Sequence, residues 1–202
     1  MPHSRVTRGQ GLLEGFLAKR RSNMANKLIP ADYRQGRILD IGCGSYPLFL
    51  LNTDFSTKHG LDKAMQEDYR RIMQSHGIIL TNHDIEKSNK LPFDDEYFNI
   101  ITMLAVFEHI QEQTSTKLLN NIYRILKPGG MYIMTTPSVW TDNLLRFMAK
   151  LRLVSSVEIE EHKTLYNHVK ICSILEEANF SKEKLRFGYF EMFMNMWVTA
   201  TK

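Results

Sequence analysis

A short apolar strand that runs directly into two glycines constrains this chain more than any other feature. Residues 37–41 read Arg-Ile-Leu-Asp-Ile, and Gly42-Cys43-Gly44 follows at once. The apolar run 47–51 then predicts a helix with proline in its first turn. Glycines at such a turn let the backbone approach a ligand closely, and helix-start amides can receive anionic or polar groups. Strand, tight turn and helix in this order open a nucleotide-binding βαβ unit.

Strands and helices continue to alternate beyond this turn. The apolar patterns predict further strands at 59–62, 78–81, 98–104 and 131–136, with helices over 64–75, 114–126 and 168–178, and two closing strands at 185–190 and 193–201. No helix separates the two closing strands, so they should pair as an antiparallel hairpin. We therefore expect an α/β fold with a doubly wound, Rossmann-like, seven-stranded and mostly parallel sheet, a C-terminal antiparallel hairpin and a helical cap.

The length of 202 residues fits one domain. We expect an N-terminal helical lid over 1–30, a cofactor-binding core over 37–136, a cap insertion over 137–167, and a C-terminal helix and strand pair over 168–202. The cap carries an apolar stripe at helical spacing (Trp140, Leu144, Phe147, Met148 and Leu151). Such a stripe is most often core, but above the carboxyl edge of a sheet it is also a candidate roof for a pocket.

Composition excludes several classes of protein. Hydrophobic residues make up 43% and charged residues 24%, so the chain can fold without covalent staples. Cys43 and Cys172 lie far apart, which argues against a disulfide framework or a CxxC metal site and for a reducing compartment. The longest apolar run, 98–107, is about half the roughly 20 residues that a membrane helix needs. With no secretory signal after Met1, we expect a cytoplasmic protein without stable membrane insertion.

The formal charge of +4 has its clearest cluster near the N-terminus, at Arg5, Arg8, Lys19, Arg20 and Arg21. Dispersed charges of this kind usually form a solvated helix face. The alternative is attraction to an anionic acceptor or to an acidic membrane surface. Aromatic residues do not alternate with these cations as they would on a nucleic-acid platform, so no nucleic-acid partner is expected.

Two aspartates follow the next strands. Asp62 comes about 20 residues after the glycine turn, where a carboxylate can accept hydrogen bonds from a ribose diol, although it could instead cap the following helix. Asp84 could receive an adenine amino group, or it could be an exposed turn carboxylate. A dinucleotide fingerprint that starts at Gly42 needs its third glycine at position 47, which is Pro47. A dinucleotide-dependent oxidoreductase is therefore disfavoured.

Taken together, the motifs resemble the class I S-adenosylmethionine-dependent methyltransferases. The resemblance rests, in the family's order, on residues 38–44 (ILDIGCG), 60–64 (GLDKA), 84–85 (DI), 91–98 (LPFDDEYF), 106–110 (VFEHI) and 126–130 (LKPGG). It covers positions 37–136. Two positions depart from the family's pattern: Tyr46 replaces a small residue, so its ring must point away from the cofactor or close over it, and Asn99 replaces the usual aspartate.

The resemblance implies roles for individual positions. Asp40, Gly42 and Gly44 would hold the methionine part of S-adenosylmethionine, Asp62 the ribose, and Asp84 with Ile85 the adenine. The backbone of Leu104 and Ala105 would contact the sulfonium, and Tyr46 and Lys63 complete the expected cofactor-binding set. The product would be S-adenosylhomocysteine.

Methyl transfer from a sulfonium is an in-line displacement, so alignment and exclusion of water can supply most of the catalysis. His109 and His162 are candidate bases for a hydroxyl acceptor, and each could equally be a structural histidine. Glu108, Trp140 and Tyr166 are candidate substrate-binding residues. A metal set drawn from Glu108, His109 and residues 160–162 can be imagined, but its spacing is unsuited and no metal is expected. Cys43 should pack rather than react.

The expected partner is a small-molecule methyl acceptor, such as a metabolite, a sugar or a lipid precursor. Residues 104–107 read Leu-Ala-Val-Phe, so the motif of many enzymes that methylate amino groups of nucleic acids is absent. The alternative is a regulatory module that binds S-adenosylmethionine without turnover. A monomer or a homodimer fits either hypothesis.

Overall fold

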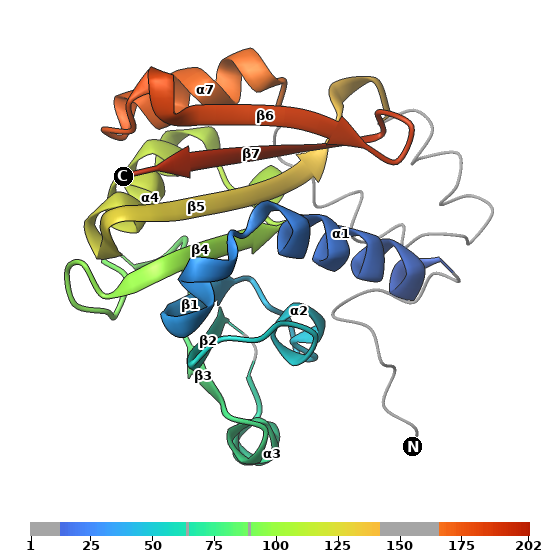
Figure 1. The fold of residues 1–202 in the computed structure, drawn as a ribbon, viewed down its shortest axis with the longest axis vertical. Helices are drawn as coiled ribbons and strands as arrows, with labels where there is room; N and C mark the ends of the chain where they lie inside the picture. Colours follow the sequence, from blue (N-terminus) through green and yellow to red (C-terminus); the bar gives the residue numbers. More distant parts are fainter. Residues whose placement is uncertain (1–12, 64, 89, 142–165) are drawn as a thin grey trace.

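The computed structural model describes residues 13–63, 65–88, 90–141 and 166–202, in which a seven-stranded sheet carries helices on both faces (Figure 1). The strands are β1 (Arg37–Ile41), β2 (Thr57–Asp62), β3 (Ile78–Asn82), β4 (Phe98–Leu104), β5 (Leu126–Pro137), β6 (Leu185–Phe190) and β7 (Asn195–Thr201). The helices are α1 (Glu14–Leu28), α2 (Leu48–Leu51), α3 (Glu67–Ser75), α4 (Glu112–Ile125) and α7 (His168–Glu177), with 3-10 turns η1 (Ala31–Gln35), η2 (Phe107–His109), η3 (Val139–Thr141) and η4 (Lys182–Lys184).

The strand order is β3-β2-β1-β4-β5-β7-β6. Strands β1 to β5 run parallel, and β7 lies antiparallel between β5 and β6. This arrangement confirms the expected doubly wound sheet and its closing antiparallel pair. The order reverses direction between β1 and β4, and ligands of open α/β sheets bind at the carboxyl ends of the strands beside such a point.

Alternate side chains of the central strands enter two different cores. On one face, Leu39 and Ile101 pack with residues of α4 and α7, including Leu119 and Leu175. On the other face, Ile38 and its neighbours pack with residues of α1, α2 and α3. A parallel strand that is covered on both faces needs apolar side chains on both, and this accounts for the continuous apolar runs in the sequence.

Helix α1 packs on the sheet through one narrow stripe. Ala18, Ser22, Ala25 and Ile29 recur at spacings of three and four residues, and all four are buried. The second half of α1 therefore belongs to the core. The proposal that 1–30 act as a lid stays a prediction, and removing residues up to 25 would also uncover buried surface.

Several boundaries differ from those expected. Helix α3 begins at Glu67 rather than at Ala64, with Gln66 as its N-cap. Strand β5 begins at Leu126, because Leu126 pairs with Phe98. The N–H of Gly129 donates to the carbonyl of Lys202, and the carbonyl of Gly130 accepts the N–H of Lys202. Strand β7 begins at Asn195, because the three residues before Met194 adopt left-handed backbone conformations that end the pairing.

Asn99, which departs from the family's pattern, has a structural role at the start of β1. Its side-chain Oδ1 accepts the backbone N–H of Arg37 at 3.0 Å. In the described part of the chain, no helix is both long and apolar enough to cross a membrane. Most of the cap that we expected over 137–167 lies outside the described residues.

Candidate functional site

The glycine turn after β1 is held against the ends of two neighbouring strands. Gly42 and Gly44 have φ angles of +75° and +70°, which glycine adopts at little cost. The N–H of Gly42 donates to the carbonyl of Leu61 at 2.7 Å. A Cβ atom at position 42 would lie 2.4 Å from Cγ2 of Val106, so the turn packs closely on the loop after β4.

Asp62 ends β2 with its carboxylate turned toward this loop. Its Oδ2 accepts the N–H of Gly44 at 2.9 Å, and its side chain is buried. Its backbone carbonyl accepts the N–H of His83 at 2.9 Å. Because Gln66 is the N-cap of α3, Asp62 does not cap that helix. The glycine turn therefore orients the Asp62 carboxylate.

Asp40 lies behind the turn, within β1. It is buried, and its Oδ1 accepts a hydrogen bond from the Thr102 hydroxyl at 2.7 Å. Burial raises the pKa of Asp40 to about 7, with a further increase from the charge of Asp62 and an opposing effect of the Thr102 hydrogen bond. Two buried carboxyl groups near each other favour a cationic partner.

Asp84 follows β3 in a tight turn. Its Oδ1 accepts the N–H of Glu86 at 3.0 Å, and Nζ of Lys87 lies 3.7 Å from its Oδ2. Partial burial opposes ionisation of Asp84, but the backbone hydrogen bonds from Glu86 and Lys87, with the charges of Lys87 and Lys63, lower its pKa. Asp84 is thus a turn carboxylate that also faces the pocket described next.

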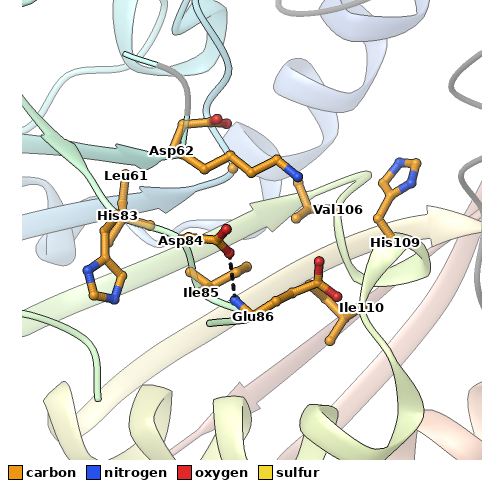
Figure 2. Close-up of a pocket in the computed structure, with 11 residues that line it drawn as sticks. Leu61, Asp62, His83, Asp84, Ile85, Glu86, Val106, His109 and Ile110 are labelled. Carbon is orange, nitrogen blue, oxygen red and sulfur yellow. Dashed lines mark hydrogen bonds between the residues drawn. The ribbon is translucent and has the colours of Figure 1, made fainter. Parts of the chain in front are cut away.

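These elements surround an open pocket (Figure 2). Its lining comes from the glycine turn, the ends of β2 and β3 and the loop after β4: Gly42, Leu61, Asp62, Lys63, His83, Asp84, Ile85, Glu86, Val106, His109 and Ile110. Six of these residues belong to the set predicted from the sequence (Gly42, Asp62, Lys63, Asp84, Ile85 and His109). The pocket lies at the carboxyl ends of the parallel strands, next to the reversal of strand order.

The loop after β4 forms the wall opposite the two aspartates. Ala105 has a φ of +54°, and its N–H donates to the carbonyl of Thr135 at 2.9 Å. The chain then turns through η2, which brings Val106 and His109 to the pocket (Figure 2). Leu104 and Ala105 do not themselves line the pocket, although they fix the start of this wall.

Glu108 points toward β5 rather than into the pocket. It is buried, and its Oε2 accepts a hydrogen bond from the Thr136 hydroxyl at 3.1 Å. Burial, and then the charge of Glu108, raise the pKa of the Tyr132 phenol. Contact between Glu108 and a substrate stays a prediction.

Tyr46, the other departure from the family's pattern, lies near α3. The pKa of the Tyr69 phenol is raised to about 12, mainly by burial and to a smaller extent by the charges of the neighbouring Tyr46 and Cys43. Tyr46 is not among the residues that line the pocket. The orientation of its ring relative to a cofactor, and cofactor contact by Tyr46, stay predictions.

The residues expected to bind the acceptor are less completely described. Tyr166 is buried, and its ring centroid lies 4.8 Å from that of Phe107. Trp140 belongs to η3, directly after β5, and its side chain is not described. His162 lies outside the described residues. Their proposed roles stay predictions.

Within the described ranges, no three His, Cys, Asp or Glu side chains gather closely enough to hold a metal ion. Residues 160–162, which completed the imagined metal set, lie outside those ranges. Cys43 is buried in the second core, as its position in the turn suggested.

Sequence reasoning missed several residues of the pocket wall. Leu61, His83, Glu86, Val106 and Ile110 all line it. Leu61 and His83 directly precede Asp62 and Asp84, so their proximity could have been inferred from chain continuity. Val106 and Ile110 flank η2, a short turn that no helical or alternating pattern reveals.

Comparison with sequence models of known protein families identifies the family of this chain. A sequence model of the family described as "Methyltransferase domain" matches residues 12–185. The chain therefore belongs to this family of S-adenosylmethionine-dependent methyltransferases, and the resemblance found in the sequence is confirmed.

Two curated relatives and one solved structure illustrate the similarity. A ubiquinone/menaquinone biosynthesis C-methyltransferase of Vibrio parahaemolyticus is 28% identical over 105 residues, which are 48% of this chain and 40% of that protein. A demethylmenaquinone methyltransferase of Symbiobacterium thermophilum is 31% identical over 123 residues, 57% of this chain and 48% of that protein. The match thus spans less than half the length of either relative.

The solved structure is an S-adenosylmethionine-dependent methyltransferase from Thermotoga maritima. It superposes with a TM-score of 0.68 at 18% identity, and the alignment covers 93% of this chain and 90% of that one. At this identity the likeness supports the fold, including its Rossmann-like sheet.

Proposed function

We propose that this chain transfers a methyl group from S-adenosylmethionine to a small-molecule acceptor. The observation that carries the proposal is the placement of Asp62 and Asp84 on one pocket beside Gly42. Carboxylates at the ends of β2 and β3 suit a ribose diol and an adenine amino group, and the glycine turn leaves room for close backbone approach.

The buried pair Asp40 and Asp62 suits the cationic end of the methionine moiety. Asp40 has a raised pKa because it is buried near a second carboxyl group, so a nearby ammonium would favour its ionised form. The Thr102 hydroxyl holds the Asp40 carboxylate on the sheet, and the Gly44 N–H holds that of Asp62. These two contacts orient both acids before any ligand arrives.

The bound cofactor supplies an electrophilic methyl on a positive sulfur, which accepts the electron pair of the broken C–S bond. The protein aligns the acceptor on the line of that bond and excludes water. His109 reaches the pocket from η2, opposite the aspartates (Figure 2). We assign to its imidazole the proton that a hydroxyl or protonated acceptor loses.

A quinone-type ring is a specific candidate acceptor. Both curated relatives carry names that refer to quinone methylation, although each matches this chain over about half its length. Transfer to such a ring would form a carbon–carbon bond, and the ring proton would leave to a base. The relatives' names favour this acceptor over a sugar.

Transfer of a radiolabelled methyl group tests the proposal. The purified chain, with labelled cofactor, is offered a demethylated quinol and, separately, metabolite extracts with and without lipids. Label in any extracted product supports transfer, and label in the quinol identifies the ring as acceptor. Cofactor binding without label in any fraction would favour the regulatory module and contradict the proposal.

Single-turnover kinetics test the role of His109. His109→Ala should slow methyl transfer, most strongly where the acceptor must lose a proton, while cofactor affinity changes little. His76→Ala, on a histidine outside the pocket after α3, serves as the control. Unchanged rates in His109→Ala would remove the assignment.

Activity that survives a strong chelator is expected, since we propose no metal.

A further inference from the structure

Large apolar side chains are exposed at the turn between β6 and β7 and on the first turn of α1. Met192 is 85% exposed, Phe193 66% and Phe16 61%. A single exposed apolar residue is ordinary, but a contiguous group marks an interaction surface.

Two sets of contacts, joined through the consecutive turn residues 191–193, make them one band. The Arg20 guanidinium lies 6.0 Å from the centroid of the Phe16 ring, and its Nε lies 3.6 Å from Oε1 of Glu191 in the turn. The rings of Phe193 and Tyr189 follow at 5.8 Å between centroids. We call this set the apolar band: Phe16, Arg20, Tyr189, Met192 and Phe193.

The turn holds its apolar side chains in strained backbone. Glu191, Met192 and Phe193 have φ angles of +52°, +54° and +68°, a region that bulky residues seldom occupy. The Ser138 hydroxyl donates to the carbonyl of Phe193 at 2.8 Å, and the Met194 N–H donates to that of Glu191 at 3.0 Å. Strain that the surrounding structure maintains is concentrated at functional sites.

The band lies at the edge of the sheet where an acceptor would arrive. In Figure 1 the arrowheads of β4 and β5 point toward the side on which the β6–β7 turn and the beginning of α1 lie. Ser138, which fastens the turn, directly follows β5. A surface bound to the band would thus face the same edge as the pocket.

The charges beside the band are basic. Lys19, Arg20 and Arg21 follow Phe16 on α1, and the first two are exposed. Among the described residues, Glu191 pairs with Arg20, and its side chain is only 5% exposed. The whole chain carries +4, so two copies joined through this surface would bring like charges together. An anionic partner fits better.

We propose that the apolar band docks the protein on an anionic lipid surface. Met192 and Phe193 enter the boundary between headgroups and acyl chains, while Lys19 faces the lipid phosphates and the half-exposed Arg20, paired with Glu191, lies beside it. Aromatic and basic side chains with apolar bodies suit such an interface. The docking is peripheral and reversible, and it concerns where the protein works rather than the methyl transfer itself.

Vesicle co-sedimentation tests the proposal. The full chain should pellet with phosphatidylcholine vesicles that contain phosphatidylglycerol, less with phosphatidylcholine alone, and less as salt is added. The double variant Met192→Asn/Phe193→Asn removes the apolar groups but keeps residues that tolerate left-handed backbone. It should weaken binding by about tenfold or more. Ile72→Ser, at a 52% exposed site on α3, is the matched control and should bind like the wild type.

Three further results bear on the proposal. Affinity for S-adenosylhomocysteine and the melting temperature should be unchanged in the double variant; if either falls, Phe16→Ser provides the same vesicle test from the other side of the band. Equal vesicle binding by the wild type, by Met192→Asn/Phe193→Asn and by Phe16→Ser would overturn the proposal. So would light scattering that shows a wild-type dimer converted to a monomer by the double variant, since the band would then join two copies.

Discussion

Gly42 illustrates how a single residue couples the cofactor turn to the opposite wall of the pocket. Its backbone needs a positive φ, and the space beside it is filled by Val106. Gly77 has nearly the same φ, +72°, with no atom within 4 Å of an added Cβ. A comparison of the two positions therefore separates the cost of backbone strain from the cost of steric overlap with a neighbour.

Replacing each glycine by alanine should give different losses of stability. Gly77→Ala should cost about 1 kcal/mol from the left-handed backbone alone. Gly42→Ala should cost about 3 kcal/mol, because the same strain is joined by overpacking against Val106. Urea unfolding of both variants measures the difference. Equal losses would mean that the turn does not pack on the loop after β4 as described.

Asp40 should make the stability of the ligand-free protein depend on pH. Its pKa is about 7 in the folded protein against a usual 3.8, so the folded state holds the proton more tightly. The stability from this group is complete below pH 3.8 and is lost as the pH rises to about 7. Asp40→Asn should remove this pH dependence of the free energy of unfolding, which amounts to about 4 kcal/mol over that range.

Urea unfolding across this pH range measures the slope. In the variant, stability should fall less between the two pH values than in the wild type. Asp54→Asn, at an exposed position after α2, is the matched control and should keep the wild-type slope. Parallel curves for wild type and Asp40→Asn would contradict the raised pKa of this buried carboxyl group.

At the level of single residues, the sequence predicted the parts of the site that follow from local order. Gly42 directly follows β1, Asp62 ends β2, and Asp84 lies two residues beyond β3, so chain direction alone brings them to one edge of a parallel sheet. The orientation of Glu108 toward Thr136 could not be predicted, because it depends on the pairing of β4 with β5 and on a turn of three residues.

Among the elements, the apolar strands were located well and the helix starts less well. Strands β1 and β4 match their predicted ranges because continuous apolar runs have sharp ends. Helix α3 begins three residues later than expected, since its charged sequence carries no capping side chain that marks the start. Side-chain caps are informative where they exist, as in α7.

The N-cap of α7 provides a test at this scale. Oδ1 of Asn167 accepts the N–H of Lys170 at 2.8 Å. Asn167→Ala should destabilise the protein by about 1 kcal/mol, because that N–H loses its partner at the helix start. Asn167→Ser keeps a capping oxygen, so its loss of stability should be only a few tenths of a kcal/mol. Thermal unfolding would contradict the assignment if alanine and serine behaved alike.

For the whole molecule, the alternation of strands and helices determined the class of fold. The two apolar faces of β1 and β4, the helices between strands and the closing strand pair all lead to one doubly wound sheet. The insertion of β7 between β5 and β6, and the contact of Arg20 with Glu191 from opposite ends of the chain, depend on long-range packing. No local pattern contains that information.

Calorimetric titration with S-adenosylhomocysteine tests the central claim, that a glycine turn and two aspartates form one cofactor pocket. The purified, cofactor-stripped wild type should bind. Asp62→Asn should bind about tenfold or more weakly, because a charged hydrogen-bond acceptor is lost. Asp54→Asn should bind like the wild type. Wild-type protein without measurable affinity, or equal affinity in Asp62→Asn, would contradict the claim.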